Sequence, residues 1–122
     1  MKSNKKSEYG ELITKIIKDK NMTQAEFYNK LGIKKPYFYD IIGGKINPPP
    51  SEIQIKILKI LKPKEEESRK LLDIAARERK EIPADIMMYI ENNTNLLSNI
   101  RNNLKYKKFF EKIVNKGENG YE

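Results

Sequence analysis

Residues 22–45 read MTQAEFYNKLGIKKPYFYDIIGGK, and the other segments of the chain can be placed around them. Thr23 is followed three residues later by Glu26, which is the spacing of a capping box, so a helix is predicted to begin directly after the threonine. Gly32 supplies a positive φ where this helix ends, and a second short helix is predicted over 35–42. Two short helices joined by a tight turn form a helix-turn-helix, whose second helix commonly lies in the major groove of DNA.

Apolar side chains recur at helical spacing through both predicted helices. They are Ala25, Phe27, Tyr28 and Leu31 in the first helix, and Phe38, Ile41 and Ile42 in the second. Gly43 and Gly44 follow directly, and both tolerate the left-handed conformation that a helix end needs. Because two short helices cannot bury these faces alone, further helices must complete the core.

The segment resembles the helix-turn-helix of the Xre/Cro/cI family, the lambda-repressor-like DNA-binding domains. The matching features are the TQAE start with Gln24, the turn Leu31-Gly32-Ile33, the core positions Phe38 and Ile41, the pair Gly44-Lys45, and the break Pro48-Pro49-Pro50-Ser51. The resemblance covers roughly Glu8 to Leu61, about half of the chain. It implies an all-α, lambda-repressor-like bundle of about five helices, followed in this chain by a C-terminal helical extension.

A helix is predicted over 7–20, before the helix-turn-helix. Its apolar stripe consists of Tyr9, Leu12, Ile13, Ile16 and Ile17. We expect this stripe in the core, because the next two helices need a partner for their own apolar faces. Residues 1–7 are polar and basic, and we interpret them either as an arm that lies along phosphates or in the minor groove, or as a frayed terminus.

Two more helices are predicted after the proline break. One covers 51–62, where Ser51 and Gln54 form a second capping box and the core residues are Ile53, Ile57, Leu58, Ile60 and Leu61. Pro63 stops this helix, and the other covers 64–80, with Leu71, Leu72, Ala75 and Ala76 on its apolar face. Residues 1–80 are thus predicted to form one DNA-binding domain with a basic N-terminal arm.

Residues 81–122 are predicted to form a helical extension that serves dimerisation or another interaction. A short helix is expected from Pro83 to about 92, with its buried face formed by Ile86, Met87 and Ile90. A last helix is expected over 95–116, lined by Leu96, Leu97, Ile100, Leu104, Phe109, Phe110, Ile113 and Val114. This surface either folds back onto the first domain or pairs with a second copy. Residues 71–90 also look like a tail found in some prophage-type regulators of the family.

The composition excludes several classes of function. The chain has 122 residues and contains neither cysteine nor histidine, so disulfides, zinc fingers and catalysis by either residue are excluded. We expect no enzyme, no catalytic residue, no metal and no cofactor. The longest uncharged apolar run, residues 86–90, is too short to span a bilayer, and no signal peptide is recognised. We therefore expect no membrane partner and a cytoplasmic location, in a bacterium or in the host cell of a phage.

The charge is strongly basic and unevenly distributed. The net charge is +8, of which residues 1–62 carry +7 and residues 63–122 carry +1. An AT-rich genome favours lysine codons, which explains many lysines but not this asymmetry. The basic excess coincides with the helix-turn-helix, as the neutralisation of phosphates requires.

Seven residues are predicted to contact DNA: Gln24, Lys34, Lys35, Tyr37, Tyr39, Asp40 and Lys45. The resemblance implies that Gln24 bonds a phosphate and steadies the second helix, while the amides at its own helix start add to the clamp. Lys35 is the stronger candidate for reading guanine O6 and N7, and Lys34 and Lys45 are candidates for phosphate contacts.

Each of these assignments has a simpler alternative. The two tyrosines can bond phosphate through their hydroxyls or meet thymine methyls with their rings, or they can be half-buried packing residues. Gln24 can be merely a good helix former, and Lys45 can be a solvated surface lysine.

Three residues depart from the family pattern. Tyr28 stands where the family has a small residue, so it either widens the contact between the two helices or swings outward. Pro36 removes a backbone donor and a base-reading side chain from an early position of the second helix. Asp40 places a carboxylate where the groove potential is negative, although it can accept a hydrogen bond from cytosine N4.

The sequence supports a sequence-specific, double-stranded DNA-binding transcriptional regulator of phage or mobile-element type, acting as a repressor. We expect a homodimer that reads a pseudo-palindromic operator. The alternative is a protein-interaction module on the same scaffold, such as an antitoxin or an inhibitor of a host defence enzyme. Binding that survives high salt would favour the alternative, because phosphate-driven binding falls steeply with salt.

Overall fold

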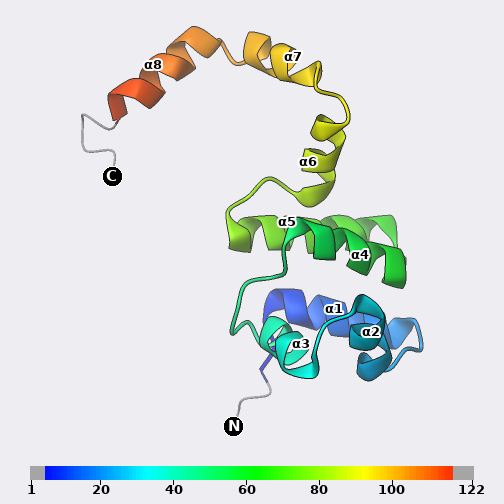
Figure 1. The fold of residues 1–122 in the computed structure, drawn as a ribbon. Coiled ribbons are helices and arrows are strands. Elements are labelled where there is room, and N and C mark those ends of the chain that lie inside the picture. Colours follow the sequence, from blue (N-terminus) through cyan, green and yellow to red (C-terminus); the bar gives the residue numbers. More distant parts are fainter. Residues whose placement is uncertain (1–4, 117–122) are drawn as a thin grey trace. The chain divides into compact units, whose positions relative to one another are not determined.

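The computed structural model describes residues 5–116, which form eight α-helices and no strand (Figure 1). The helices are α1 (Glu8–Asp19), α2 (Gln24–Leu31), α3 (Lys35–Ile42), α4 (Ser51–Leu61), α5 (Glu65–Arg79), α6 (Ala84–Glu91), α7 (Leu96–Asn103) and α8 (Tyr106–Lys116). The all-α class is therefore confirmed, while the helices outnumber the expected bundle of about five. The chain divides into two compact units, residues 1–87 and 88–122.

The core of the first unit lies among α1 to α5. α1 contacts α2, α3 and α5, and α4 contacts α2; in Figure 1 these helices form one bundle. The largest fully buried side chains are Phe27, Phe38, Ile13, Ile16, Ile17, Leu61, Leu71 and Pro49. Burial of one such aliphatic or aromatic side chain contributes about 1.5–3 kcal/mol, so the shared core is what holds these short helices together.

The start of α1 is joined tightly to the end of α3. The Ser7 backbone amide donates to the Ile42 carbonyl oxygen at 2.9 Å, and the Ser7 hydroxyl caps α1 by accepting from the Gly10 amide at 3.0 Å. A Cβ atom at Gly10 would overlap the Ile42 backbone, so only glycine permits this approach. Gly44 has a φ of +77° and lies against Ser7, whereas Gly43 keeps an ordinary φ of −82°. Only one of the two glycines therefore uses the left-handed conformation.

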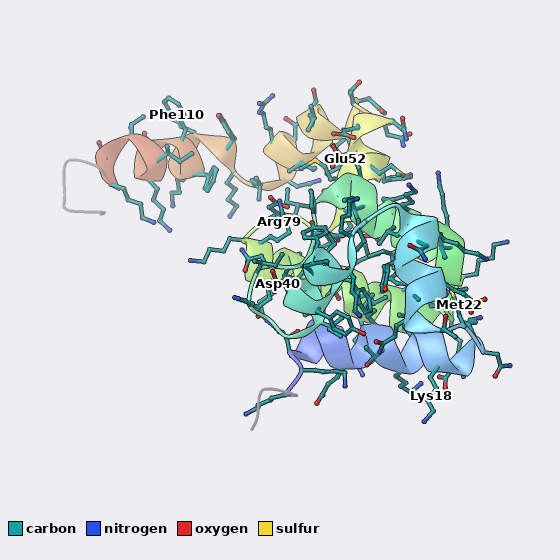
Figure 2. The ribbon with its side chains drawn as sticks, turned by 60° about the horizontal axis from the view of Figure 1, so that its bottom comes forward. Lys18, Met22, Asp40, Glu52, Arg79 and Phe110 are labelled. Atoms are coloured by element: carbon teal, nitrogen blue, oxygen red, sulfur yellow. The ribbon has the colours of Figure 1, made fainter. Side chains whose placement is uncertain are left out.

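Polar contacts attach α5 to the rest of the bundle. Arg77 pairs with Glu8 at 2.6 Å, and the Arg79 guanidinium donates to the Pro48 carbonyl at 3.1 Å. Arg79, labelled in Figure 2, is only partly exposed and also pairs with Glu81 at 3.0 Å. Exposed ion pairs contribute little to stability, so these contacts orient α5 while buried Leu71 and its neighbours stabilise it.

The second capping box predicted from Ser51 and Gln54 is wrong. Pro50 is the N-cap of α4, Ser51 is already helical, and no side chain caps this helix. Gln54 is buried, and its amide nitrogen donates to the Pro49 carbonyl at 2.8 Å. A capping box needs a side-chain oxygen and an N–H at the N-cap, and proline offers neither.

The predicted buried face of α6 is also wrong. Ile86 is 49% exposed, Met87 and Ile90 are half-buried, and Ala84 is the buried residue of this helix. The apolar run from 86 to 90 predicted a buried face because we assumed that another element would cover it, and the exposure of Ile86 contradicts this assumption. Among the described residues, no helix is both long enough and apolar enough to cross a membrane.

The single helix predicted over 95–116 is two helices, α7 and α8. α7 ends at Asn103, and Lys105 adopts a left-handed φ of +50° before α8 begins. At about 100° per residue, a continuous helix would turn the apolar residues of 106–114 roughly 125° away from those of 96–104. The break allows each helix to place its apolar residues on one face. The shift in the spacing of apolar residues between 104 and 106 is visible in the sequence.

Candidate nucleic-acid interface

The start of α2 is fixed by the predicted capping box. The Thr23 hydroxyl accepts from the Glu26 amide at 3.0 Å, and the Glu26 carboxylate accepts from the Thr23 amide at 2.8 Å. The bond from the Thr23 backbone lowers the pKa of Glu26 below its usual value. These two reciprocal hydrogen bonds fix the first turn of α2. They therefore also fix the position of Gln24, the residue that follows the cap.

The turn between α2 and α3 sets the position of the second helix. Gly32 has a φ of +83°, and its amide and that of Ile33 both donate to the Tyr28 carbonyl at 3.0 Å. α3 then begins at Lys35, with Lys34 as its N-cap in extended conformation. Phe38 packs against Phe27 with ring centroids 5.9 Å apart, which fixes the inner face of α3 in the core.

A hydrogen bond joins the exposed edges of α2 and α3. The Tyr39 hydroxyl donates to Gln24 Oε1 at 3.1 Å. This bond uses the amide oxygen of Gln24 and leaves its NH₂ group as a donor, which is the polarity that a phosphate requires. Gln24 is half-buried and Tyr39 is 43% exposed, so both side chains can be reached from solvent while they brace one another.

The outer face of α3 is open among the described residues of the bundle. Lys34, Lys35 and Pro36 are exposed, and Asp40 is half-buried. Pro36 is the second residue of the helix, where a missing N–H breaks no helical hydrogen bond, so its effect on α3 is small. Lys45 lies past the end of α3, exposed, with its amide donating to the Asp40 carbonyl at 3.0 Å.

Two tyrosines lie between the core and the surface. Tyr28 is half-buried and packs against Phe38 with ring centroids 5.4 Å apart, so it fills the edge of the α2–α3 contact. Tyr37 is half-buried as well and packs against the core beside Tyr9. Burial raises the pKa of Tyr9, and the neighbouring Tyr37 adds to that rise. The structure thus places Tyr37 with the packing residues, apart from the Gln24–Tyr39 pair.

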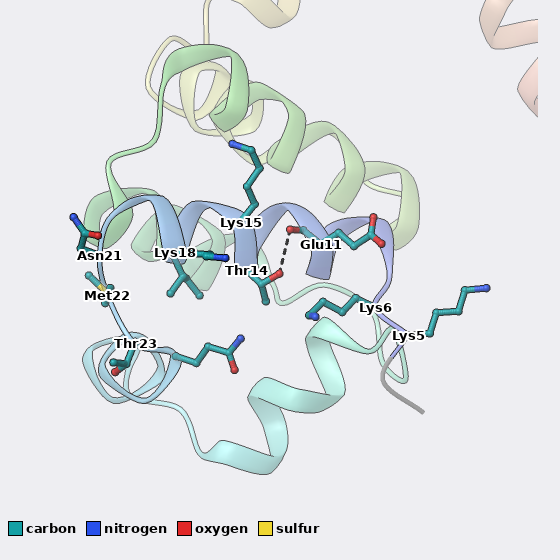
Figure 3. Close-up of a pocket in the computed structure, with 11 residues that line it drawn as sticks. Lys5, Lys6, Glu11, Thr14, Lys15, Lys18, Asn21, Met22 and Thr23 are labelled. Carbon is teal, nitrogen blue, oxygen red and sulfur yellow. Dashed lines mark hydrogen bonds between the residues drawn. The ribbon is translucent and has the colours of Figure 1, made fainter. Parts of the chain in front are cut away.

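A groove of about 820 Å³ runs between α1 and the start of α2. Lys5, Lys6, Lys18 and Gln24 are among the residues that line it. Figure 3 shows Lys18 on the side of α1 that faces α2, and Lys6 extended between α1 and α3, whereas Lys5 points away. The lining contains one carboxylate, that of Glu11, so lysines and the first residues of a helix together make the groove suited to an anion.

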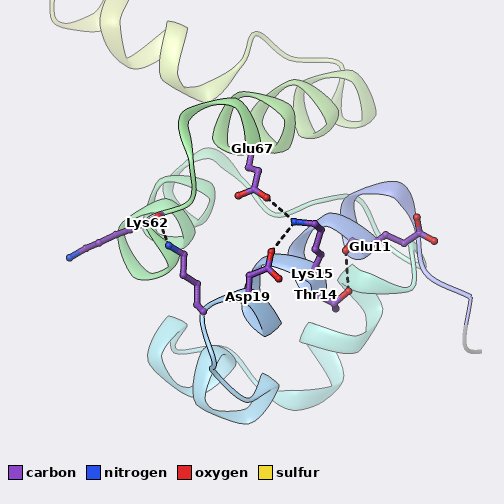
Figure 4. Close-up of polar contacts among 7 residues, drawn as sticks. Glu11, Thr14, Lys15, Asp19, Lys62 and Glu67 are labelled. Atoms are coloured by element: carbon purple, nitrogen blue, oxygen red, sulfur yellow. Dashed lines mark hydrogen bonds and ion pairs between the residues drawn. The ribbon is translucent and has the colours of Figure 1, made fainter.

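Lys15 lines the same groove but has its charge neutralised within the bundle. Its ammonium group lies 2.8 Å from the Asp19 carboxylate and 3.0 Å from that of Glu67 (Figure 4). Hydrogen bonds to Asp19 and then Glu67 raise the pKa of Lys15. The cations left for a ligand are therefore those of Lys6 and Lys18.

Sequence reasoning did not include Lys6 and Lys18 among the candidate contacts. Lys18 occupies the last turn of α1, and the sequence pattern predicted only an exposed helix end there. Lys6 belongs to the segment interpreted as an arm or a frayed terminus. The useful signal existed for Lys18 alone, since a short connection brings the last turn of one helix beside the first turn of the next.

No group of three or more acidic, histidine or cysteine residues lies close enough to hold a metal ion within residues 5–116. The candidate interface consists instead of donors and cations on α1, α2 and α3. No family model, no curated protein and no solved structure matches this chain.

Proposed function

We propose that residues 7–79 bind double-stranded DNA in a sequence-specific manner and act as a transcriptional regulator, with α3 in the major groove. The observation that carries the proposal is the Gln24–Tyr39 hydrogen bond, because it couples the amide-rich start of α2 to the exposed edge of a short helix. In a helix-turn-helix the second helix lies in the major groove while the first crosses the backbone, so a bond between the two helices helps to fix both contacts.

Phosphate contacts position the protein on the duplex. The first amides of α2 and the Gln24 NH₂ group donate to one phosphate, and Lys6 and Lys18 neutralise its neighbours from the groove beside them. Lys34 and Lys45 flank the two ends of α3 and meet the backbone on either side of the groove. These contacts supply affinity without sequence information.

Base contacts come from the outer face of α3. Lys35 donates to guanine O6 and N7 from the first residue of the helix, and the exposed part of the Tyr39 ring meets a thymine methyl group. Asp40 accepts from cytosine N4 and repels other bases that lack a donor there. Pro36 has no hydrogen-bonding side chain, so it contributes shape alone.

Regulation follows from occupancy of the site. Two copies read the halves of a pseudo-palindromic operator, and the bound pair excludes polymerase from the promoter. This is the behaviour of a repressor, and the resemblance of residues 71–90 to a prophage-type tail favours a phage or mobile-element origin.

The test is selection of bound sequences from a random pool of duplex DNA by the full chain. The expected result is convergence on one motif with two related halves. A pool that stays random after repeated selection would remove the proposal.

Lys35→Ala is then measured on the selected site. We expect a loss of about 1–3 kcal/mol in binding, with preference relaxed at one base pair. Lys59→Ala is the matched control, since Lys59 is an exposed lysine on α4 that lies outside the candidate interface. An equal loss on every sequence would make Lys35 a phosphate contact instead.

A further inference from the structure

Within the described part of the second unit, residues 88–116, the last helix has an exposed apolar face. Tyr106, Phe109, Phe110, Ile113 and Val114 of α8 are each between 39% and 51% exposed, and no residue of α7 or α8 is buried. At 3.6 residues per turn these five side chains share one arc of about 140°. Phe110 is labelled in Figure 2 among the side chains that project from this helix.

Lysines border this arc on both sides. Lys107 follows one edge, and Lys112 and Lys116 follow the other, while Glu111 is the single acidic residue of α8 and lies on the opposite face. No acidic residue falls within the apolar arc. Long lysine side chains beside an apolar face can extend their ammonium groups outward from a buried stem.

The charge of this unit selects among possible occupants. Residues 88–122 carry six Lys or Arg and four Glu, a net charge of +2, and the positive charge gathers in α8, which has four Lys and one Glu. Two copies that paired through α8 would bring these lysines together at a like-charge cost. A partner that has an apolar layer beneath a negatively charged surface would instead bind favourably to both the apolar arc and the lysines of α8.

We propose that α8 binds the surface of an anionic lipid bilayer. The helix lies in the plane of the interface, with the phenylalanines among the upper acyl chains and Tyr106 at the headgroup level. Lys107 and Lys112 reach outward to the lipid phosphates. An eleven-residue helix is about 16 Å long, too short to span a bilayer but sufficient to lie along one.

The preceding helix adds to this surface. Leu97, Ile100 and Leu104 are 41% to 50% exposed and share one side of α7. The Arg101 guanidinium lies 5.7 Å from the Tyr106 ring centroid, which joins the end of α7 to the start of α8 by a cation–π contact. The lipid-binding function is separate from DNA binding, because none of these residues belongs to α1, α2 or α3.

The experiment is co-flotation of the full, DNA-free chain with vesicles of phosphatidylcholine alone or mixed with phosphatidylglycerol. We expect flotation with the anionic vesicles and none with phosphatidylcholine. The double variant Phe109→Ser/Phe110→Ser should weaken flotation at least about tenfold, and Lys107→Glu/Lys112→Glu should weaken it similarly.

Matched controls separate this result from other causes. Ile82→Ser changes an exposed apolar residue before α6, and Lys70→Glu reverses an exposed lysine on α5, so both should float as the natural chain does. Lys35→Ala should also float normally, which excludes binding through the candidate DNA interface. Circular dichroism checks that every variant keeps its helix content.

Three results would overturn the assignment. The first is no flotation of the natural chain with phosphatidylglycerol vesicles. The second is flotation that the α8 variants leave unchanged. The third is a stable dimer or complex with another protein, seen by light scattering, that Phe109→Ser/Phe110→Ser dissociates, because the apolar face would then be covered by protein.

Discussion

The α1–α5 bundle and the α7–α8 pair share the same amphipathic pattern but differ in what covers it. Phe38 of α3 is 1% exposed, whereas Phe110 of α8 is 48% exposed. Both residues belong to an apolar stripe of a short helix. The comparison teaches that periodicity predicts a helix and its face, whereas burial depends on whether another element of the chain meets that face.

The bundle achieves burial because each short helix contacts others in the same unit. α1 packs against α2, α3 and α5, and α2 packs against α4 as well. α7 and α8 contact one another at their shared corner, around Arg101 and Tyr106, and no residue of either helix is buried. Short helices in water owe most of their stability to packing, so the bundle should be the more stable part.

The largest expected effect separates Phe38 from Phe110. Phe38→Ala should lower the free energy of unfolding by about 3–5 kcal/mol, because it leaves a cavity in the core. Phe110→Ala should change it by less than about 0.5 kcal/mol. Urea unfolding followed by circular dichroism measures both, and Phe38→Leu serves as a milder core variant if Phe38→Ala does not fold. Equal losses of unfolding free energy at Phe38 and Phe110 would contradict the claim that only the first side chain is held in a core.

A smaller contrast concerns the backbone contact of α1 with α3. Gly10→Ala should cost about 1–3 kcal/mol, because the new Cβ overlaps the Ile42 carbonyl group and the helices must separate. Asn102→Ala on exposed α7 should stabilise its helix by a few tenths of a kcal/mol, since alanine is the better helix former. Thermal unfolding of the two variants beside the natural chain checks both signs.

The next effect tests the hydroxyl that joins α2 to α3. Tyr39→Phe removes the bond to Gln24 and should weaken DNA binding by about 0.5–1.5 kcal/mol, with unfolding little changed. Tyr106→Phe is the counterpart in α8, where the tyrosine makes ring contacts with Phe109 and Phe110. It should leave DNA binding unchanged in a fluorescence anisotropy titration. If Tyr39→Phe bound DNA with the affinity of the natural chain, the hydrogen bond from Tyr39 would not be needed to position Gln24.

The smallest effect is the pH dependence of the α2 cap. The Thr23 amide lowers the pKa of Glu26 in the folded chain, so the carboxylate stabilises the fold above its ordinary pKa of 4.5. This contribution is lost as the pH falls from 4.5 through the lower folded value. Glu26→Gln should therefore be less stable than the natural chain at neutral pH and should approach it in acid. A stability difference that stays constant with pH would contradict the role of the charge.

The sequence predicted the local chemistry of the bundle well. The capping box at Thr23 and the positive φ at Gly32 are both confirmed, because each depends on residues within a few positions of one another. The burial of Phe27 and Phe38 is confirmed as well, since their stripes meet inside one core.

Features that depend on contacts between distant segments of the chain could not be predicted from the sequence. Gly10 carries no periodic signal, yet the approach of Ile42 makes it essential to the α1–α3 contact. The face expected to be buried on α6 is largely open, because no described helix covers Ile86. Lys15 and Lys18 are neighbours on α1, but only coordinates show that Glu67 neutralises the first while the second faces the groove. The break at Lys105 could have been predicted from the change of apolar phase.

The bond between Ser7 and Ile42 has a consequence for how a DNA sequence would be read. Because the first turn of α1 is tied to the last carbonyl of α3, a change of tilt in α3 must carry α1 and the groove lysines with it. Positions that never meet a base, such as Gly10 and Gly44, would then tune which operator is preferred. New target sites would then evolve through substitutions at the contact between α1 and α3 as well as through the side chains that face the bases.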